Sequence, residues 1–255
     1  MKPILELSGI YYSYHTTEGE TPVLSNISFA LGKGEFLAIV GPSGCGKSTL
    51  LSIIAGLLEP ERGLIKFDGK YHQECPPGIG YMLQHDHLFE WRNVYQNVTL
   101  GLEIQKQLTP RSKAKAMELL KTYGLDRFKN SRPSELSGGM RQRAALIRTL
   151  VMEPDILLLD EPFSALDYQT RLTVGDDIGQ ILRKEHRTAI LVTHDLSEAI
   201  SLADRIIIMS PRPATIKQKV ALTFQLEQDT PLHRRNATEF KNYFNLIWEE
   251  INNNE

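Results

Sequence analysis

The sequence is short of the features that mark secreted and membrane-spanning chains. Its 2 cysteines, Cys45 and Cys75, lie far apart, so nothing suggests a disulfide framework and a reducing compartment is the simpler expectation. Lys2, Pro3 and Glu6 interrupt any apolar run at the N-terminus, which argues against a signal peptide. No stretch approaches the roughly 18 to 20 apolar residues that span a bilayer. A role at a membrane would therefore need a partner protein.

The sequence also lacks an excess of charge of either sign. The formal net charge is -2 and no long basic run occurs, so binding to nucleic acid has no electrostatic support. We find no internal repeat and no low-complexity linker, which favours one unit over a tandem pair. The chain has an ordinary globular composition of 255 residues, 41% hydrophobic and 24% charged. That is enough apolar material for one domain with a full core.

Hydrophobic patterns predict a three-layer α/β core with a helical insert. Short apolar runs such as Phe36 to Val40 and Ile156 to Leu159 are typical of parallel strands buried on both faces. An antiparallel N-terminal sheet is expected at 4–14 and 23–31, with a turn-rich stretch at 16–22 between its strands. Further strands are expected at 64–67, 80–84, 189–193 and 206–209, where strands and helices alternate.

Helix signals occur at several places along the chain. Thr109-Pro110 has the pattern of an N-cap followed by proline at the first helical position, and Gly124 that of a helix stop. Apolar residues between 240 and 251 recur at helical spacing, which predicts a terminal amphipathic helix. Other helices are expected at 47–57, after the LSGGM segment up to Pro154, at 168–184 and briefly after Asp195.

A phosphate-binding loop is the first chemical motif. GPSGCGKST matches G-x-x-x-x-G-K-[ST] at every fixed position, between an apolar strand and a helix. Its glycines let backbone N–H groups converge on phosphate oxygens, and the helix presents its positive end to the same anion. An ordinary glycine-rich turn is the alternative. Lys47 should reach the β- and γ-phosphates, and Ser48 should ligate magnesium. The predicted nucleotide-binding residues are Gly41, Pro42, Ser43, Gly44, Cys45, Gly46, Lys47, Ser48 and Thr49.

Two acids end the apolar run at 156–159. Asp160 and Glu161 stand at the carboxyl end of a predicted buried strand, where open α/β sheets place their ligands. Successive residues leave a strand in different directions, so the two acids can take different roles. Asp160 is expected to hold magnesium and Glu161 to polarise the attacking water. A solvated acidic turn is the alternative.

The segment LSGGM precedes a predicted helix. Ser137 and the N–H groups of Gly138 and Gly139 would form another anion site at a helix N-terminus. Ser137 could also serve only as the helix cap. Two glycines are poor helix starters, however, and add nothing to such a cap.

In this order the motifs resemble those of ATP-binding cassette (ABC) ATPases, over residues 4–209. The resemblance implies a P-loop NTPase (RecA-like) core with an N-terminal antiparallel β subdomain and an inserted helical subdomain. We expect a single domain, 1–255, with a nucleotide-binding core at 1–84 and 151–225, a helical subdomain at 85–150 and a helical tail at 226–255. LSGGM corresponds to the ABC signature, with Met140 where many members have glutamine. The signature residues expected to contact the γ-phosphate held by another copy are Ser137, Gly138 and Gly139.

The resemblance also gives roles to residues outside these motifs. Gln84 matches the Q-loop glutamine, which touches magnesium or the attacking water. SALD (164–167) matches the D-loop at the dimer seam, with Asp167 as its acid, and His194 matches the switch histidine that contacts the γ-phosphate. Tyr14 is the best match for the aromatic that stacks on adenine. A surface glutamine, a structural histidine and a core tyrosine are the alternatives.

Such ATPases work in pairs. The resemblance implies an ATP-dependent homodimer that binds ATP and Mg²⁺ between each P-loop and the opposite signature. Closure of this homodimer is expected to drive integral membrane permease subunits between inward- and outward-facing states. In importers, a solute-binding protein also binds to these subunits. The expected location is the cytoplasmic side of the cell membrane, peripheral, with no nucleic acid bound.

Finer resemblance points to one branch of importers. The segment 84–98, LSGGMRQR and MSPRPATI are similar to ATPases that serve uptake of nitrate, sulfonate and taurine, and Ile247-Trp248 fits a C-terminal helix of that branch. The branch usually has Pro-Trp where this chain has Glu90-Trp91. Importer ATPases for thiamine-precursor pyrimidines share these features and remain an alternative.

ABC ATPases of other classes are the wider alternatives. Members that act on chromosomes carry a long coiled coil before the signature, whereas only 85–135 lies there in this chain. Translation factors usually carry two cassettes in one chain, and exporters often fuse the cassette to membrane helices. A non-transport role stays open, because a fold does not fix a function.

Overall fold

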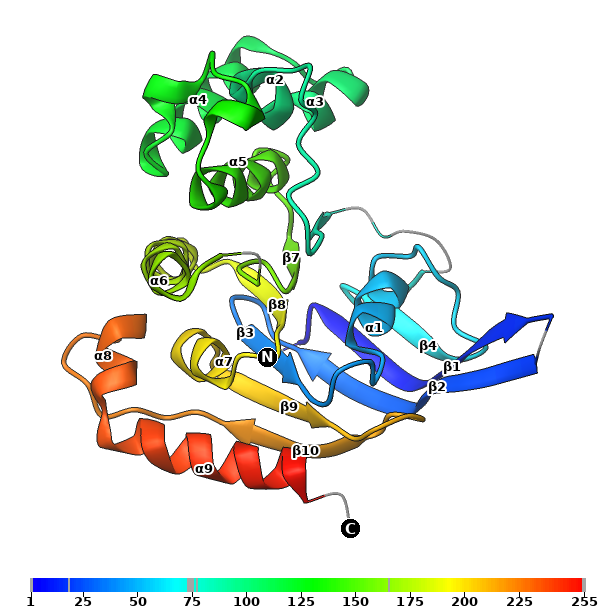
Figure 1. The fold of residues 1–255 in the computed structure, drawn as a ribbon. Helices are drawn as coiled ribbons and strands as arrows, with labels where there is room; N and C mark the ends of the chain where they lie inside the picture. The colour runs from blue at the N-terminus through cyan, green and yellow to red at the C-terminus, as the bar shows by residue number, and fades with distance from the viewer. Residues whose placement is uncertain (1, 18, 73–75, 77, 165, 254–255) are drawn as a thin grey trace.

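Two β-sheets and a separate group of helices make up the fold (Figure 1). The computed structural model describes residues 2–17, 19–72, 76, 78–164 and 166–253. Cys75 and Ala165, which belong to sequence features named above, lie outside the described residues. The fold is a P-loop NTPase core with an antiparallel N-terminal sheet and a helical insert, as the sequence predicted.

The central sheet carries the phosphate-binding loop. Within the described residues it has six strands in the order β10-β9-β3-β8-β7-β6. β10 runs antiparallel to β9, and the other neighbours are parallel. The strands are β3 (Phe36–Val40), β6 (Ile79–Met82), β7 (Ile156–Asp160), β8 (Thr188–Val192), β9 (Arg205–Met209) and β10 (Ile216–Ala221).

Both faces of this sheet are covered, which explains its continuous apolar runs. Every residue of β3, β7 and β8 is buried. Side chains alternate between the faces, so Leu37 and Ile39 belong to one apolar core while Ala38 and Val40 belong to the other. The first core includes α1 (Lys47–Ile54) and the N-terminal sheet, and the second includes the helices on the opposite face.

The N-terminal sheet packs beside α1 (Figure 1). It consists of β1 (Leu5–Thr16), β2 (Gly19–Leu31), β4 (Arg62–Phe67) and β5 (Lys70–Tyr71), in the order β2-β1-β4-β5. Adjacent strands are antiparallel. This sheet brings β1 close to the helix that follows the phosphate-binding loop.

The helical insert lies beyond the two sheets, and its last helix packs on the core (Figure 1). It comprises α2 (Val94–Val98), α3 (Leu100–Ile104), α4 (Pro110–Thr122), the 3₁₀ turns η1 (Asp126–Phe128) and η2 (Pro133–Glu135), and α5 (Gly138–Leu150). Thr109 caps α4 with proline next to it, as predicted. α5 contacts α2, α3 and α4 within the insert, and α6 and β6 of the core.

The remaining helices cover the core and its far edge. They are α6 (Tyr168–Lys184), α7 (Leu196–Leu202), α8 (Pro231–Asn236) and α9 (Thr238–Asn252). α9 lies along the outer strands of the central sheet (Figure 1) and buries Ile247 completely. The predicted amphipathic tail helix is therefore confirmed. In the described part of the chain, no helix is both long and apolar enough to cross a membrane.

Some sequence-based boundaries were wrong. The stretch 16–22 is mostly strand, because β1 continues to Thr16 and β2 begins at Gly19. The helix expected at 47–57 ends at Ile54, and Gly56 with φ 70° follows its C-cap in the left-handed conformation that stops helices. α5 begins inside LSGGM at Gly138. The strands β5 and β10 were not predicted, and α8 was expected only as part of the helical tail at 226–255, not as a separate helix.

Candidate functional site

The phosphate-binding loop is held by close contacts at its glycines. Gly46 has φ 116°, and a Cβ there would lie 2.6 Å from Cγ1 of Val23, so only glycine fits between the loop and β2. Lys47 is 6% exposed, and its Nζ donates to the carbonyl oxygens of Gly41 at 2.9 Å and Pro42 at 3.0 Å. The ammonium group is thus fixed against the start of the loop. The thiol of Cys45 is buried beside it, and burial raises its pKa.

Asp160 meets the loop from the end of β7. Its Oδ1 accepts a hydrogen bond from Ser48 Oγ at 2.9 Å, and its Oδ2 accepts one from the Tyr81 hydroxyl at 3.3 Å. Burial raises the pKa of Asp160, and the two hydrogen bonds oppose that shift. Burial likewise raises the pKa of Tyr81 to about 12, so this phenol stays a donor at neutral pH.

Two of the predicted site residues, Gln84 and His194, lie close to the same carboxylate oxygen of Glu161. Its Oε2 accepts from Gln84 Nε2 at 3.2 Å and lies 3.2 Å from Nδ1 of His194. Gln84 follows β6, Glu161 follows β7 and His194 follows β8, and these three strands are neighbours in the sheet. Glu161 has φ 46°, in the left-handed region that non-glycine residues adopt rarely.

These groups share one pocket. Its volume is about 540 Å³, and its lining joins the phosphate-binding loop to Glu161 and the two residues around its Oε2, Gln84 and His194. Asp160, 6% exposed, lies behind Ser48. The residues that line the pocket are Ser43, Gly44, Gly46, Lys47, Ser48, Thr49, Gln84, Glu161, His194 and Arg212.

Tyr14 reaches the same loop from β1. Its hydroxyl lies 3.2 Å from Oγ1 of Thr49, and its ring meets Tyr12 edge to face at 5.1 Å. The side chain is 40% exposed. A core position, the alternative considered for this tyrosine, does not fit that exposure.

The signature residues lie elsewhere. Ser137 caps α5 by accepting from the Met140 N–H at 3.3 Å, and a Cβ on Gly139 would lie 3.0 Å from Thr170 of α6. Ser137 and Gly139 line a shallow pocket of about 280 Å³ with residues of α5 and α6. This pocket shares no lining residue with the one at the phosphate-binding loop. Within one chain, therefore, the signature does not complete the nucleotide site.

Asp167 begins α6. Its Oδ1 accepts from the Thr170 N–H at 3.1 Å, and hydrogen bonding at this cap lowers the pKa of the exposed carboxyl. The turn before it is held by Arg171, whose Nη2 donates to Leu166 O at 3.1 Å. Arg171 Nη1 also lies 3.4 Å from Oδ2 of Asp195, which follows His194 directly.

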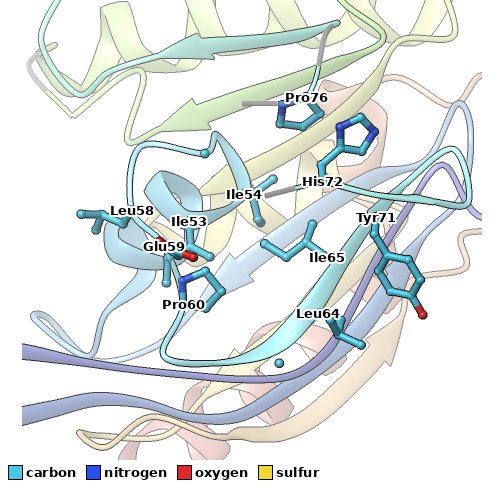
Figure 2. Close-up of a pocket in the computed structure, with 12 residues that line it drawn as sticks. Ile53, Ile54, Leu58, Glu59, Pro60, Leu64, Ile65, Tyr71, His72 and Pro76 are labelled. Atoms are coloured by element: carbon cyan, nitrogen blue, oxygen red, sulfur yellow. The ribbon is translucent and has the colours of Figure 1, made fainter. Parts of the chain in front are cut away.

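Another cavity, of about 480 Å³, contains none of the predicted site residues. It lies between the C-terminal end of α1, β4 and β5, and its walls are mostly apolar, including Ile53, Ile54 and Ile65 (Figure 2). Tyr71 and His72 stand at one side of it (Figure 2). Apolar walls cannot replace the hydration of a triphosphate, so this cavity does not suit one.

Sequence reasoning missed several residues at the site. Tyr81, Arg171 and Glu198 belong to no motif: Tyr81 and Arg171 reach Asp160 and Asp195 from other parts of the chain, and Glu198 lies within a short helix. Glu198 is fully buried on α7 and accepts from the Thr193 hydroxyl, next to His194, at 2.5 Å. Arg212 had a signal: it lies in MSPRPATI, which pointed to a branch of importers without giving the arginine a role.

Comparison with known proteins agrees with this geometry. A family model described as "ABC transporter" matches residues 24–164, more than half of the chain. An uncharacterized ABC transporter ATP-binding protein of Bacillus subtilis, YtlC, is 45% identical over 97% of this chain and 95% of its own length.

Other relatives have names that give a solute. The taurine import ATP-binding protein TauB of Pelagibacter ubique is 42% identical, over 83% of this chain and 80% of the relative. The aliphatic sulfonates import ATP-binding protein SsuB of Bacillus cereus is 43% identical, over 82% of each chain. Among solved structures, a dimeric post-hydrolysis state of the ATP-binding cassette MJ0796 with ADP and Pi has a TM-score of 0.74 at 30% identity, covering 86% of this chain and 99% of that one.

Proposed function

The chain belongs to the ABC transporter family of ATP-binding, ATP-hydrolysing proteins, and on that premise we propose that it is the ATPase subunit of an importer for a small solute. The proposed solutes are of the nitrate, sulfonate or taurine kind, carried through a separate permease. The named relatives that import taurine and aliphatic sulfonates support this class.

The separation of the signature from the phosphate-binding loop is the main support for a mechanism that uses two copies of the chain. The catalytic groups line one pocket and the signature lines another, with no residue in common. A second copy, turned face to face, can supply its signature to the first copy's nucleotide and receive the same in return. A related cassette forms a dimer in its post-hydrolysis state with ADP and Pi. We therefore propose an ATP-dependent homodimer with two shared sites.

Within each site the side chains divide the work. The loop N–H groups and Lys47 bind the phosphates. Glu161 takes the proton of the attacking water as general base, because its Oε2 faces the pocket between Gln84 and His194. Gln84 orients that water, and His194 contacts the γ-phosphate. Catalysis is then mainly positioning and electrostatic stabilisation of a transferring phosphoryl group.

The donors beside the loop fit Mg²⁺. Ser48 Oγ and Asp160 Oδ1 are oxygen atoms 2.9 Å apart, and oxygen donors are those that Mg²⁺ takes beside a nucleotide's phosphates. We propose Ser48, Asp160 and the amide oxygen of Gln84 as its protein contacts. When bound, the ion neutralises charge on the phosphate oxygens.

Roles are also proposed for the residues at the adenine base of ATP and at the dimer interface. Tyr14 stacks on adenine, since it is exposed and hydrogen-bonded to Thr49 at the far end of the loop. The partner's Ser137, Gly138 and Gly139 receive the γ-phosphate, and Asp167 lies at the dimer seam. The division into core (1–84 and 151–225), helical subdomain (85–150) and tail (226–255) also belongs to this proposal.

The permease is proposed to dock on the segment after Gln84. Trp91 is 71% exposed there, and its ring lies 4.6 Å from that of Phe89. Glu90, which departs from the Pro-Trp of the branch, accepts from the Ser134 N–H at 3.1 Å, just before the signature. Asp86 pairs with Arg141 of α5 at 3.1 Å. Movement of the docked segment would thus reach the signature helix directly.

A thiamine-precursor pyrimidine is the alternative solute, and a non-transport ABC ATPase is the more distant alternative. We propose that the protein acts on the cytoplasmic face of the membrane through its permease, with a solute-binding protein as indirect partner. The test is co-purification with the native permease and solute-binding protein, followed by identification of the ligand on the latter. Recovery of a sulfonate, taurine or nitrate supports the proposal. A pyrimidine, or failure of any permease to co-purify with an ATP-hydrolysing chain, contradicts it.

A further inference from the structure

The turn after β9 is built as a rigid support beside the phosphate-binding loop. Its ends are joined by hydrogen bonds from Ser210 N to Thr215 O at 3.0 Å and from Thr215 N to Ser210 Oγ at 2.9 Å. Ala214 is fully buried and exchanges hydrogen bonds with β2, donating to Val23 O at 2.8 Å and accepting from Ser25 N at 2.9 Å. Residues 210–215 are therefore fixed to the same strand that the loop packs against.

From this turn Arg212 reaches over the loop. Its Nε donates to the carbonyl oxygen of Gly44, and its Nη2 would lie 3.7 Å from a Cβ on Gly44. The side chain lines the pocket that contains Lys47, Glu161 and His194. It also lines a flanking hollow over Pro42, Ser43 and Cys45. The guanidinium thus stands at the edge of the nucleotide pocket, over the first half of the loop.

The charge of Arg212 is uncompensated in the described part of the chain, where none of the ion pairs includes it. A guanidinium has five N–H donors, of which the contact with Gly44 uses one. Planar guanidinium groups with free donors are suited to binding phosphate oxygens.

The positions of Tyr14 and Arg212 along the phosphate-binding loop indicate which phosphate of the nucleotide Arg212 faces. Tyr14, proposed to stack on adenine, meets the loop at Thr49, whereas Arg212 meets it at Gly44. The phosphate chain runs from the base toward the opposite end of the loop. Its last phosphate therefore lies nearest Arg212, in the pocket that Glu161 and His194 also line.

We propose that Arg212 donates hydrogen bonds to the terminal phosphate of ATP and so makes the site discriminate ATP from ADP. This inference rests on the proposed function, because it needs the nucleotide to lie along the loop with its base at Tyr14. None of the sequence motifs described above gave Arg212 a role in nucleotide binding.

The test compares affinities for two nucleotides in the full-length protein. Isothermal titration calorimetry with Mg-AMP-PNP and Mg-ADP is carried out on the wild type, Arg212→Ala and Arg212→Gln. Loss of a charge-assisted contact should weaken AMP-PNP binding about tenfold or more and ADP binding less than about twofold. The amide introduced in R212Q can still donate to Gly44 O, so a matching loss in that variant would assign the effect to the phosphate contact.

Controls separate this inference from support of the loop and from the proposed function. Lys217→Ala removes a cation of β10 whose Nζ donates to Glu250 O and Asn253 O, away from the pocket; its affinities should equal those of the wild type. Equal weakening of both nucleotides in the Arg212 variants, or no weakening at all, would overturn the inference. Failure of the wild type to bind either nucleotide would instead contradict the proposed function.

Discussion

Arg171 Nη1 lies 3.4 Å from Asp195 Oδ2, and the same guanidinium donates through Nη2 to Leu166 O at 3.1 Å. One side chain of α6 therefore connects the turn before Asp167 with the residue after His194. Asp195 Oδ1 also caps α7 by accepting from Ser197 N at 2.8 Å. The segment at the proposed dimer seam and the proposed γ-phosphate contact are thus held as one unit.

Replacing Arg171 should uncouple the two segments. We expect Arg171→Ala to lower kcat about tenfold, because a misplaced His194 no longer holds the γ-phosphate in the geometry that transfer needs. The Kd for ATP should change less than about twofold, since the loop and Lys47 are untouched. Single-turnover hydrolysis and equilibrium binding measure the two effects. Arg187→Ala, which removes an ion pair with Glu185, is the control, and an equal loss of affinity in R171A would point to general disruption.

Glu161→Gln should separate binding from hydrolysis. The amide keeps the size of the carboxylate but cannot take a proton from water, so we expect the hydrolysis rate to fall roughly 10²-fold or more. ATP should still bind, and a dimer should accumulate because the closed sites do not reopen. Turnover assays and size-exclusion chromatography with ATP measure these outcomes. Near-normal turnover would remove Glu161 from its role as general base.

Ser137→Arg should block the site of the other copy. A long cation at the start of α5 would prevent closure over the γ-phosphate, so hydrolysis should be lost while each monomer still binds ATP. Filter binding and phosphate release distinguish the two properties. Ser8→Arg, at an exposed position of β1, controls for the added charge. If S137R monomers lose ATP binding, LSGGM serves the site of its own chain.

Glu198 should make stability depend on pH. Burial raises its pKa from the usual 4.5 to about 8, and the charges of Asp195 and Glu161 add to this shift, against the Thr193 hydrogen bond and Arg171. The folded state therefore holds a proton that the unfolded chain releases, and stability falls as pH rises from about 4.5 to about 8.

Glu198→Gln should flatten this dependence. The amide oxygen can still accept from the Thr193 hydroxyl, and no ionisation cost remains. Each unit of pKa shift corresponds to about 1.4 kcal/mol, so urea denaturation midpoints at about pH 5 and about pH 8 are sensitive enough. The wild type should lose stability between these values and E198Q should lose clearly less. Parallel losses in both proteins would show that other groups cause the dependence.

Local sequence predicted much of the fold because its signals are short-range. Thr109 and Pro110 mark the start of α4, and α6 was predicted at its observed bounds. β10 was missed because two lysines interrupt its apolar pattern, as is common on edge strands. α8 was not predicted as a separate helix because six residues are too few to show a helical period.

The phosphate-binding loop, the paired acids and the signature follow from the sequence alone, since each is a contiguous run whose spacing fixes its backbone and charge. What only the tertiary structure decided is how these pieces meet. The parallel order of β8, β7 and β6 aligns their carboxyl ends, which brings Gln84 and His194 to the same oxygen of Glu161. Packing of the turn after β9 on β2 brings Arg212 over the loop, and packing of α5 on α6 keeps the signature in a pocket of its own. Such contacts join residues far apart in the chain, so no local spacing could have revealed them.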